Sequence, residues 1–114
     1  MNTYRRGDIW WTDLGEDEWM HEKHLQTGYR PCLIVSNDIN NRCSPLVTVV
    51  PLTTHSKDLP VHTHIYIGGK LNKVLCEQIR AVPKVLLKKF MGYAEKSVVD
   101  RVEDCIKIQL GLHK

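Results

Sequence analysis

The chain has 114 residues, of which 42% are apolar and 25% are charged, and its formal net charge is +3. This length suits one domain with a single modest core, and the composition is that of an ordinary globular protein. No apolar stretch approaches the ~20 residues of a membrane span, and the first residues lack the apolar segment of a signal peptide. A cytoplasmic protein without membrane association is therefore expected.

Six short strands are predicted from runs rich in valine, isoleucine and aromatic side chains, at 9–11, 31–36, 46–52, 61–67, 74–82 and 90–94. Between the first two runs, residues 13–29 are polar and acidic and form a long connection. The turn formers of NDINNRCSP at 37–45 predict a loop.

The last segment changes to a helical period and predicts a helix over about 97–110. Ser97 is its expected N-cap, with Asp100 three residues later, and Gly111 is its expected C-terminal stop. One apolar face, a candidate for the core, is made of Val99, Val102, Ile106 and Leu110. The pattern predicts a mostly β fold, a small antiparallel barrel closed by the helix, in a single domain over 1–114.

Charge and cysteine content bear on the partners of this domain. Residues 1–29 hold three basic and six acidic side chains, whereas residues 57–96 hold eight basic and three acidic ones. The basic segment suits a phosphate-bearing partner, although lysines also simply solvate surfaces. The four cysteines are widely spaced and form no Cys-x-x-Cys pair, so neither a metal nor a cofactor is predicted.

Four stretches together resemble the MazF/PemK family of toxin endoribonucleases. They are RRGDIWWTDLG at 5–15, GYRPCLIVSNDINN at 28–41, VVPLTT at 49–54 and LCEQIRAV at 75–82. Their order and spacing also fit, so the resemblance covers nearly the whole chain. It implies an SH3-like barrel that works as a homodimer, cleaves single-stranded RNA at short sequences without a metal, and is restrained by a cognate MazE-like antitoxin. The acidic connection at 13–29 departs from the glycine- and serine-rich linker of many relatives and leaves the cleavage sequence unassigned.

Two residues match the catalytic pair that the resemblance implies. Arg30 lies between Gly28 and Pro31, and Thr53 ends the third predicted strand. Attack of a ribose 2′-hydroxyl on the adjacent phosphate builds negative charge, which a planar and permanently charged guanidinium suits. Strand alternation sends Thr54 to the opposite face from Thr53. The alternatives are an ion-paired surface arginine and an ordinary β-branched strand end.

The resemblance also implies residues that bind RNA. Glu77 and Gln78 lie in the predicted 74–82 strand, where the family reads or positions RNA. The alternative is an edge strand with one solvent-exposed face. Arg80 is predicted to contact a phosphate or to pair with a carboxylate. Tyr29 lines the groove beside Arg30 or packs in the core.

Other residues have weaker functional interpretations. Trp10 and Trp11 suit base stacking, but at least one must face the core. His55, close after Thr53, is a candidate general base, a role that the family motif does not require. His62 and His64 share one strand face but lack a third obvious metal ligand.

Two rival functions remain open from the residues alone. One is a non-catalytic toxin of the CcdB type, which binds and poisons DNA gyrase. The other is an SH3-like nucleic-acid or peptide adaptor, since fold does not fix function.

Overall fold

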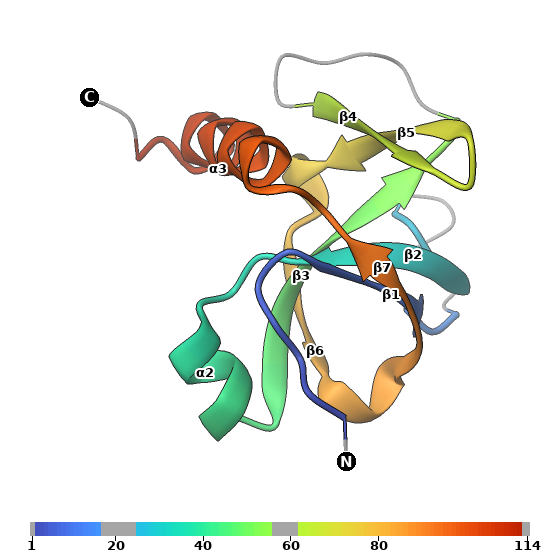
Figure 1. Ribbon diagram of the computed structural model, residues 1–114, viewed down its shortest axis with the longest axis vertical. Coiled ribbons are helices and arrows are strands. Elements are labelled where there is room, and N and C mark those ends of the chain that lie inside the picture. The colour runs from blue at the N-terminus through green and yellow to red at the C-terminus, as the bar shows by residue number, and fades with distance from the viewer. Residues whose placement is uncertain (1, 17–24, 56–61, 113–114) are drawn as a thin grey trace.

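The computed structural model describes residues 2–16, 25–55 and 62–112. One curled antiparallel sheet has the strand order β4-β5-β3-β2-β1-β7, and β6 pairs with β3 outside this path (Figure 1). The strands are β1 (Asp8–Asp13), β2 (Tyr29–Ile34), β3 (Leu46–Thr53), β4 (His62–Ile67), β5 (Lys70–Leu75), β6 (Arg80–Pro83) and β7 (Leu87–Tyr93). The helices are α2 (Asp38–Cys43) and α3 (Lys96–Leu110), with short 3-10 helices η1 (Cys76–Gln78) and η2 (Lys84–Leu86).

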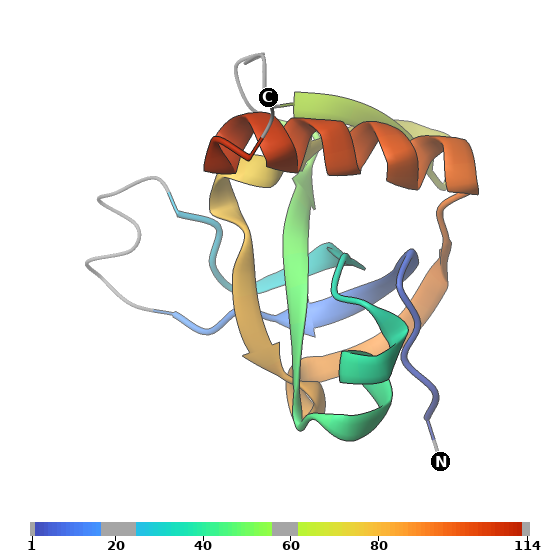
Figure 2. The ribbon, with the colours of Figure 1, turned by 90° about the vertical axis from the view of Figure 1, so that its left-hand side faces the viewer.

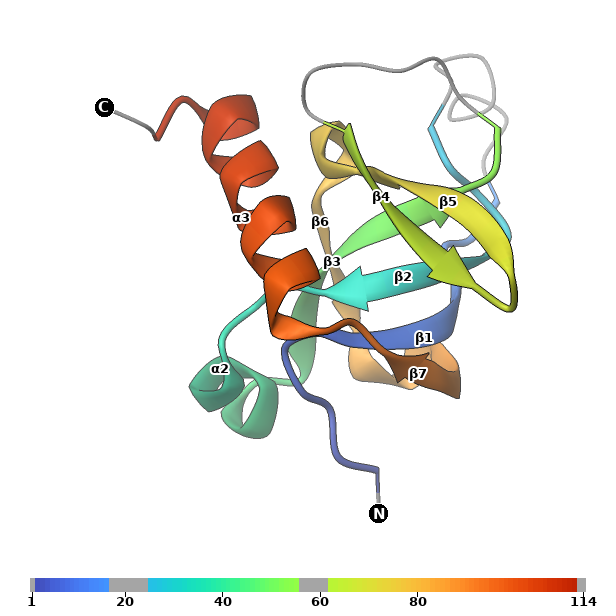
Figure 3. The same cartoon turned by 45° about the horizontal axis from the view of Figure 1, so that its top comes forward.

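The predicted mostly β fold with a C-terminal helix is confirmed. The sheet curls into a half-barrel, and α3 lies across one end of it (Figure 2). The hairpin of β4 and β5 lies beside α3 (Figure 3), and α3 contacts β4. Residues 17–24 of the acidic connection lie outside the described residues.

Alternation along β2 and β3 fills two apolar clusters, one on each side of the sheet. Leu33 and Val50 pack in the cluster that α3 covers through its fully buried Val102. Their neighbours Cys32 and Val49 pack in the other cluster. Because side chains two apart on a strand share a face, the two clusters show which side of the sheet each neighbouring side chain occupies.

The predicted apolar helix face is only partly core. Val102 is buried, and Val99 and Ile106 are half-buried against the cluster below α3. Leu110 is 50% exposed, because the helix runs past the edge of the cluster.

The expected loop at 37–45 contains a short helix, α2, so that prediction was wrong. Asn37 caps it by accepting a 2.9 Å hydrogen bond from the Asn40 backbone N–H. The buried Asn41 side chain donates to the Ser36 carbonyl oxygen, 2.8 Å away. The turn-forming side chains of this segment therefore satisfy the backbone of a helix instead of an irregular loop.

The predicted single strand at 74–82 is two strands separated by η1. Leu52 faces Val74 on β5, and Val49 faces Arg80 on β6. Three residues along β3 thus correspond to six residues along the segment from β5 to β6. The three residues of η1 take up the difference, which places the polar residues Glu77 and Gln78 outside the ladder.

The start of α3 also differs from the prediction. The N-cap is Glu95 and not Ser97, with no capping hydrogen bond from its side chain. The Glu95 carbonyl oxygen accepts from the Val98 and Val99 N–H groups, both at 3.0 Å. The predicted stop is confirmed, because Gly111 adopts the left-handed conformation, with φ of 68°.

Candidate active site

Strand pairing brings the predicted catalytic residues together. Cys32 on β2 faces Pro51 on β3 in an antiparallel ladder. Continuing this register by two residues sets Arg30 opposite Thr53. Opposed residues of antiparallel strands share a face and lie about 5 Å apart, so the two side chains emerge side by side.

The backbone around Arg30 fixes how its guanidinium is presented. Gly28 has a φ of 68°, which favours glycine, and Pro31 restricts Arg30 to extended geometry. Arg30 Nε donates to the Thr27 carbonyl oxygen at 3.0 Å. Within the described residues, its two terminal nitrogens have no hydrogen-bond partner, and the side chain is exposed. The anchored guanidinium therefore presents its outer edge to a ligand.

Thr53 is held more tightly than Arg30. It is 6% exposed, and its Oγ1 donates to the His55 carbonyl oxygen and accepts from the His55 N–H, both at 3.1 Å. Thr54 is exposed and lies beyond the end of β3.

The predicted RNA-binding residues Gln78 and Arg80 hold the segment that leads into Arg30. Gln78 Oε1 accepts from the Gln26 N–H at 2.8 Å, and Arg80 Nη2 donates to the Gln26 carbonyl oxygen at 3.2 Å. Burial lowers the pKa of Arg80. Because Gln26 adjoins the Thr27 carbonyl that accepts from Arg30, these contacts support the position of the candidate catalytic guanidinium.

Tyr29 and Trp11 form an exposed aromatic pair. Their ring centroids are 6.2 Å apart with an interplanar angle of 16°, and they are 51% and 38% exposed. Alternation places Tyr29 on the opposite face of β2 from Arg30. Trp10 is buried against Tyr4 and Phe90, so of the two tryptophans only Trp11 offers a surface for stacking. Glu77 is half-buried in η1.

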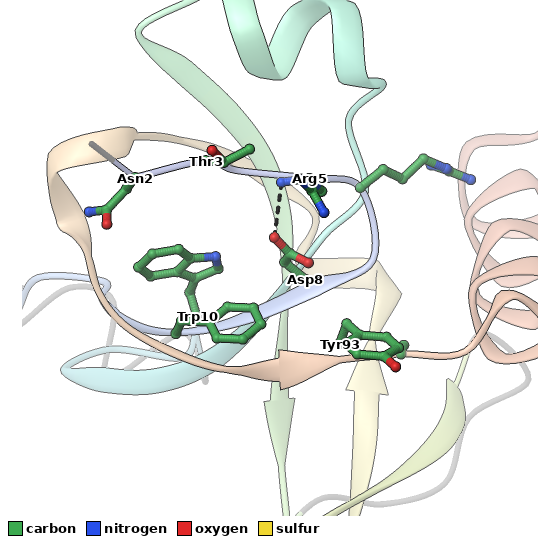
Figure 4. Close-up of a pocket in the computed structure, with 9 residues that line it drawn as sticks. Asn2, Thr3, Arg5, Asp8, Trp10 and Tyr93 are labelled. Atoms are coloured by element: carbon green, nitrogen blue, oxygen red, sulfur yellow. Dashed lines mark hydrogen bonds between the residues drawn. The ribbon is translucent and has the colours of Figure 1, made fainter.

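A cavity of about 690 Å³ lies at the other end of β1 from Arg30. Figure 4 shows Trp10 and Tyr93 on one side of it and the N-terminal segment with Arg5 on the other. The Arg5 N–H donates to Asp8 at 3.1 Å, and burial raises the pKa of Asp8. None of the predicted site residues lines this cavity. An extended polymer binds along an open surface, so the candidate site does not require an enclosed cavity.

Within the part of the chain that the structure describes, a metal site would require a group of ligating side chains, and a membrane span would require a long apolar helix. That part of the chain contains no group of three or more His, Cys, Asp or Glu side chains placed to hold a metal ion. None of its helices is long and apolar enough to cross a membrane. Burial raises the pKa of Cys32 and of Cys76 to about 12, so both thiols stay protonated near neutral pH.

The curled sheet, the terminal helix, and Arg30 and Thr53 at neighbouring strand ends define a small half-barrel domain with a candidate phosphate site. Residues 5–110 match the profile of the PemK-like, MazF-like toxins of type II toxin-antitoxin systems. The chain belongs to this family.

Relatives of known identity cover almost the whole chain. Endoribonuclease MazF of Staphylococcus saprophyticus is 36% identical, over 96% of this chain and 92% of the relative. Endoribonuclease EndoA of Bacillus subtilis is 31% identical, over 95% of each chain. A solved endoribonuclease from a mycobacterial species, in complex with its cognate antitoxin, superposes with a TM-score of 0.81 at 25% identity. That superposition covers 97% of this chain and 98% of the mycobacterial one.

Sequence reasoning missed two residues at the site. Gln26 uses its backbone N–H and carbonyl, which no side-chain motif reveals. Lys73 faces Thr53 across β3 and β5. In the sequence, Leu71, Lys73 and Leu75 alternate with Asn72 and Val74, so Lys73 shares a strand face with the two leucines. Its place beside Thr53 follows only from the pairing of β3 with β5.

Proposed function

We propose that this chain is a sequence-specific endoribonuclease that cleaves single-stranded RNA without a metal and acts as the toxin of a toxin-antitoxin pair. Membership of the PemK-like, MazF-like family supports this assignment, as do the two endoribonucleases that are 36% and 31% identical to the chain. The observation that carries it is the register of β2 and β3, which sets Arg30 opposite Thr53 when it is continued two residues beyond Cys32 and Pro51.

The proposed reaction uses the nucleophile of the substrate. The ribose 2′-oxygen attacks the adjacent phosphorus, the bond from phosphorus to the 5′-oxygen breaks, and a 2′,3′-cyclic phosphate and a 5′-hydroxyl form. A base takes the 2′-hydroxyl proton, and the leaving 5′-oxygen gains one. Arg30 stabilises the charge that grows on the phosphoryl oxygens. The Thr53 hydroxyl proton, which the His55 carbonyl oxygen accepts in the absence of substrate, turns to one of these oxygens when RNA binds. His55, two residues beyond Thr53, is a candidate base.

The four proposed RNA-binding residues are supported by different observations. Gln78 and Arg80 lie next to the Arg30 segment, and Tyr29 offers an exposed ring for stacking. Glu77 follows directly after β5 in η1. We propose that all four residues bind the substrate, with Gln78 and Arg80 also positioning Arg30.

The assembly and location complete the proposal. The chain acts as one toxin domain over 1–114, in the cytoplasm, as a homodimer that joins two shallow grooves. A MazE-like antitoxin inhibits it, which the mycobacterial complex of an endoribonuclease with its cognate antitoxin supports by analogy. A disordered acidic segment would compete with RNA for the basic surface. Light scattering that reports a monomer at micromolar concentration would contradict the dimer.

The test is digestion of a long RNA by the purified protein in EDTA, followed by sequencing of the new 5′ ends. We expect cutting at a restricted set of short sequences. A single 2′-deoxynucleotide at the scissile position should block cleavage and leave binding nearly unchanged, because only the nucleophile is removed. Intact RNA together with inhibited DNA gyrase would establish the CcdB-type alternative, and efficient cutting of the deoxy-substituted strand would overturn the mechanism.

A further inference from the structure

The outward face of the β4–β5 hairpin continues the surface that carries Arg30 and Thr53. Thr53 faces Lys73 on β5, and Lys73 faces His64 on β4. Opposed residues of antiparallel strands share a face. One line of side chains therefore crosses four strands, in the order Arg30, Thr53, Lys73 and His64.

The inner face of the same hairpin is already occupied. Ile65 and Val74 are buried in the cluster that α3 covers. Alternation turns the side chains of the other parity to the opposite side, where Leu75 is buried, Lys73 is half-buried, and His64, Tyr66 and Leu71 are exposed. We call the solvent-accessible part of this set the hairpin face, and it consists of His64, Tyr66, Leu71 and Lys73.

The hairpin face combines a large exposed ring with a cation. Tyr66 is 72% exposed and faces Leu71, which is 47% exposed. Lys73 is half-buried, faces Thr53 on β3, and lies two residues along β5 from Leu71. Aromatic rings beside basic groups are the combination by which proteins hold single-stranded nucleic acid, because bases stack on the rings and phosphates pair with the cations.

Distances along the sheet suit a strand that continues from the cleavage site. Neighbouring strands lie about 4.8 Å apart, so the backbone of Lys73 is about 5 Å from that of Thr53 and about 10 Å from that of Arg30. A cation on Lys73 can therefore reach the phosphate next to the scissile one. The segment 57–96, which includes the hairpin, is also the basic part of the sequence.

We propose that the hairpin face binds the single-stranded RNA that flanks the scissile phosphate, with Lys73 on the neighbouring phosphate and Tyr66 stacked on a base. This inference rests on the proposed endoribonuclease function. It names a subsite beyond Arg30 and Thr53, built from residues outside the four motif stretches. The exposed Tyr66 and Leu71 pair is thereby assigned to substrate and not to a second copy of the chain.

The first experiment measures binding of an RNA that the protein cannot cut. The probe contains the mapped cleavage sequence with a 2′-deoxynucleotide at the scissile position, and fluorescence anisotropy gives the affinity over a range of salt concentrations. In Lys73→Gln, the slope of log affinity against log salt should fall by about 0.7, the value for one phosphate contact to a single strand. Lys70→Gln is the matched control, because Lys70 lies on the same strand, is exposed and has the opposite parity. Equal slopes for the two variants would overturn the subsite.

The second experiment tests stacking and separates substrate from self-association. Tyr66→Ala should weaken binding of the same probe about five- to hundredfold, the usual cost of losing one stacked base, while Tyr66→Phe should bind normally. Shortening the probe on one side of the scissile position should weaken the wild type and leave Tyr66→Ala unchanged. Unchanged affinity in Tyr66→Ala, or its conversion to a monomer in sedimentation, would overturn the inference.

Failure of the subsite and failure of the proposed function give different results. If the wild type cuts RNA but the hairpin variants bind normally, the subsite is wrong and the endoribonuclease stands. If the wild type cuts no RNA, the proposed function itself fails.

Discussion

Two arginines near opposite ends of β2 have opposite surroundings. Arg6 donates from its backbone N–H to Asp38 Oδ1 at 2.7 Å, and its side chain bonds to the Val35 carbonyl oxygen and to Glu103 Oε1, the latter at 2.9 Å. Arg30 makes one hydrogen bond within the described residues, from Nε to the Thr27 carbonyl oxygen. The first guanidinium is engaged at both terminal nitrogens, and the second at neither among the residues that the structure describes.

The difference shows how to distinguish a structural arginine from one that is available for chemistry. Arg6 joins the N-terminal segment, β2 and α3, so its bonds are part of the fold. Arg30 is anchored only enough to fix its direction, and its outer edge remains for a ligand. Arg80 combines the two roles in this proposal, because its Nη2 bonds to Gln26 and Gln78 within the protein while the residue is also proposed to bind substrate. Loss of Arg30 should therefore affect catalysis, and loss of Arg6 should affect stability.

The largest effect is expected for Arg30→Ala. Removing one donor to a charge that develops in the transition state typically lowers the rate ~10²–10³-fold, while the free energy of unfolding should change by less than about 0.5 kcal/mol. Arg30→Lys keeps the charge but loses the planar fork, so it should remain badly impaired. The measurement is single-turnover cleavage of a short RNA, with Arg42→Ala, an exposed arginine of α2, as control. Normal cleavage by Arg30→Ala would remove it from the active site.

The next effect separates the two adjacent threonines. Thr53→Ala should slow cleavage by about 10–10²-fold, less than Arg30→Ala, because it removes a neutral donor. Thr53→Ser keeps the hydroxyl and should recover most of the activity. Thr54→Ala should cleave normally, because Thr54 lies beyond the end of β3. The same single-turnover assay applies, and a Thr54 variant more damaged than Thr53→Ala would reverse the assignment.

The fold was predictable where one physical signal dominated. The buried strands of Leu33 and Val50 follow from apolar β-branched runs, and the end of α3 follows from Gly111. The polar segment at 37–45 was wrongly predicted as a loop, because asparagine both forms turns and caps helices, and the choice depends on the buried partners of Asn41. The division at η1 depends on a register shift between two strands, which no local pattern encodes.

The same limit applies to the candidate site. Motif resemblance identified Arg30 and Thr53, and the glycine and proline that flank Arg30 explain its presentation. The opposition of these residues, and the place of Lys73 next to them, come from pairings between segments that are distant along the chain. Such non-local contacts depend on the whole sheet, so the sequence near each residue does not reveal them.

A smaller effect, on stability and not on cleavage, is expected for Arg6→Ala. Losing hydrogen bonds from a charged donor should lower the free energy of unfolding by about 1–3 kcal/mol, because the Val35 carbonyl oxygen and Glu103 lose their partner. Urea titration at a fixed protomer concentration should show a lower midpoint with an unchanged slope. Arg101→Ala, an exposed arginine of α3, is the control. Cleavage per folded molecule should stay normal, and a cleavage defect as large as that of Arg30→Ala would erase the contrast between the two arginines.

The smallest effect is expected for Lys96, which pairs with a carboxylate on the surface. Lys96 Nζ and Asp100 Oδ2 are 3.0 Å apart, and their side chains are 88% and 55% exposed. Exposed pairs at this spacing contribute about 0.3–0.5 kcal/mol, and a lysine at the start of a helix opposes the helix dipole, so the two terms nearly cancel. Lys96→Ala should therefore change the free energy of unfolding by less than about 0.5 kcal/mol. A double-mutant cycle with Asp100→Ala in urea measures the coupling directly. If that coupling exceeded the loss in Arg6→Ala, the number of partners within the protein would not be what distinguishes the cations of this chain. The interpretation of Arg30 as a cation kept available for ligand would then lose its physical basis.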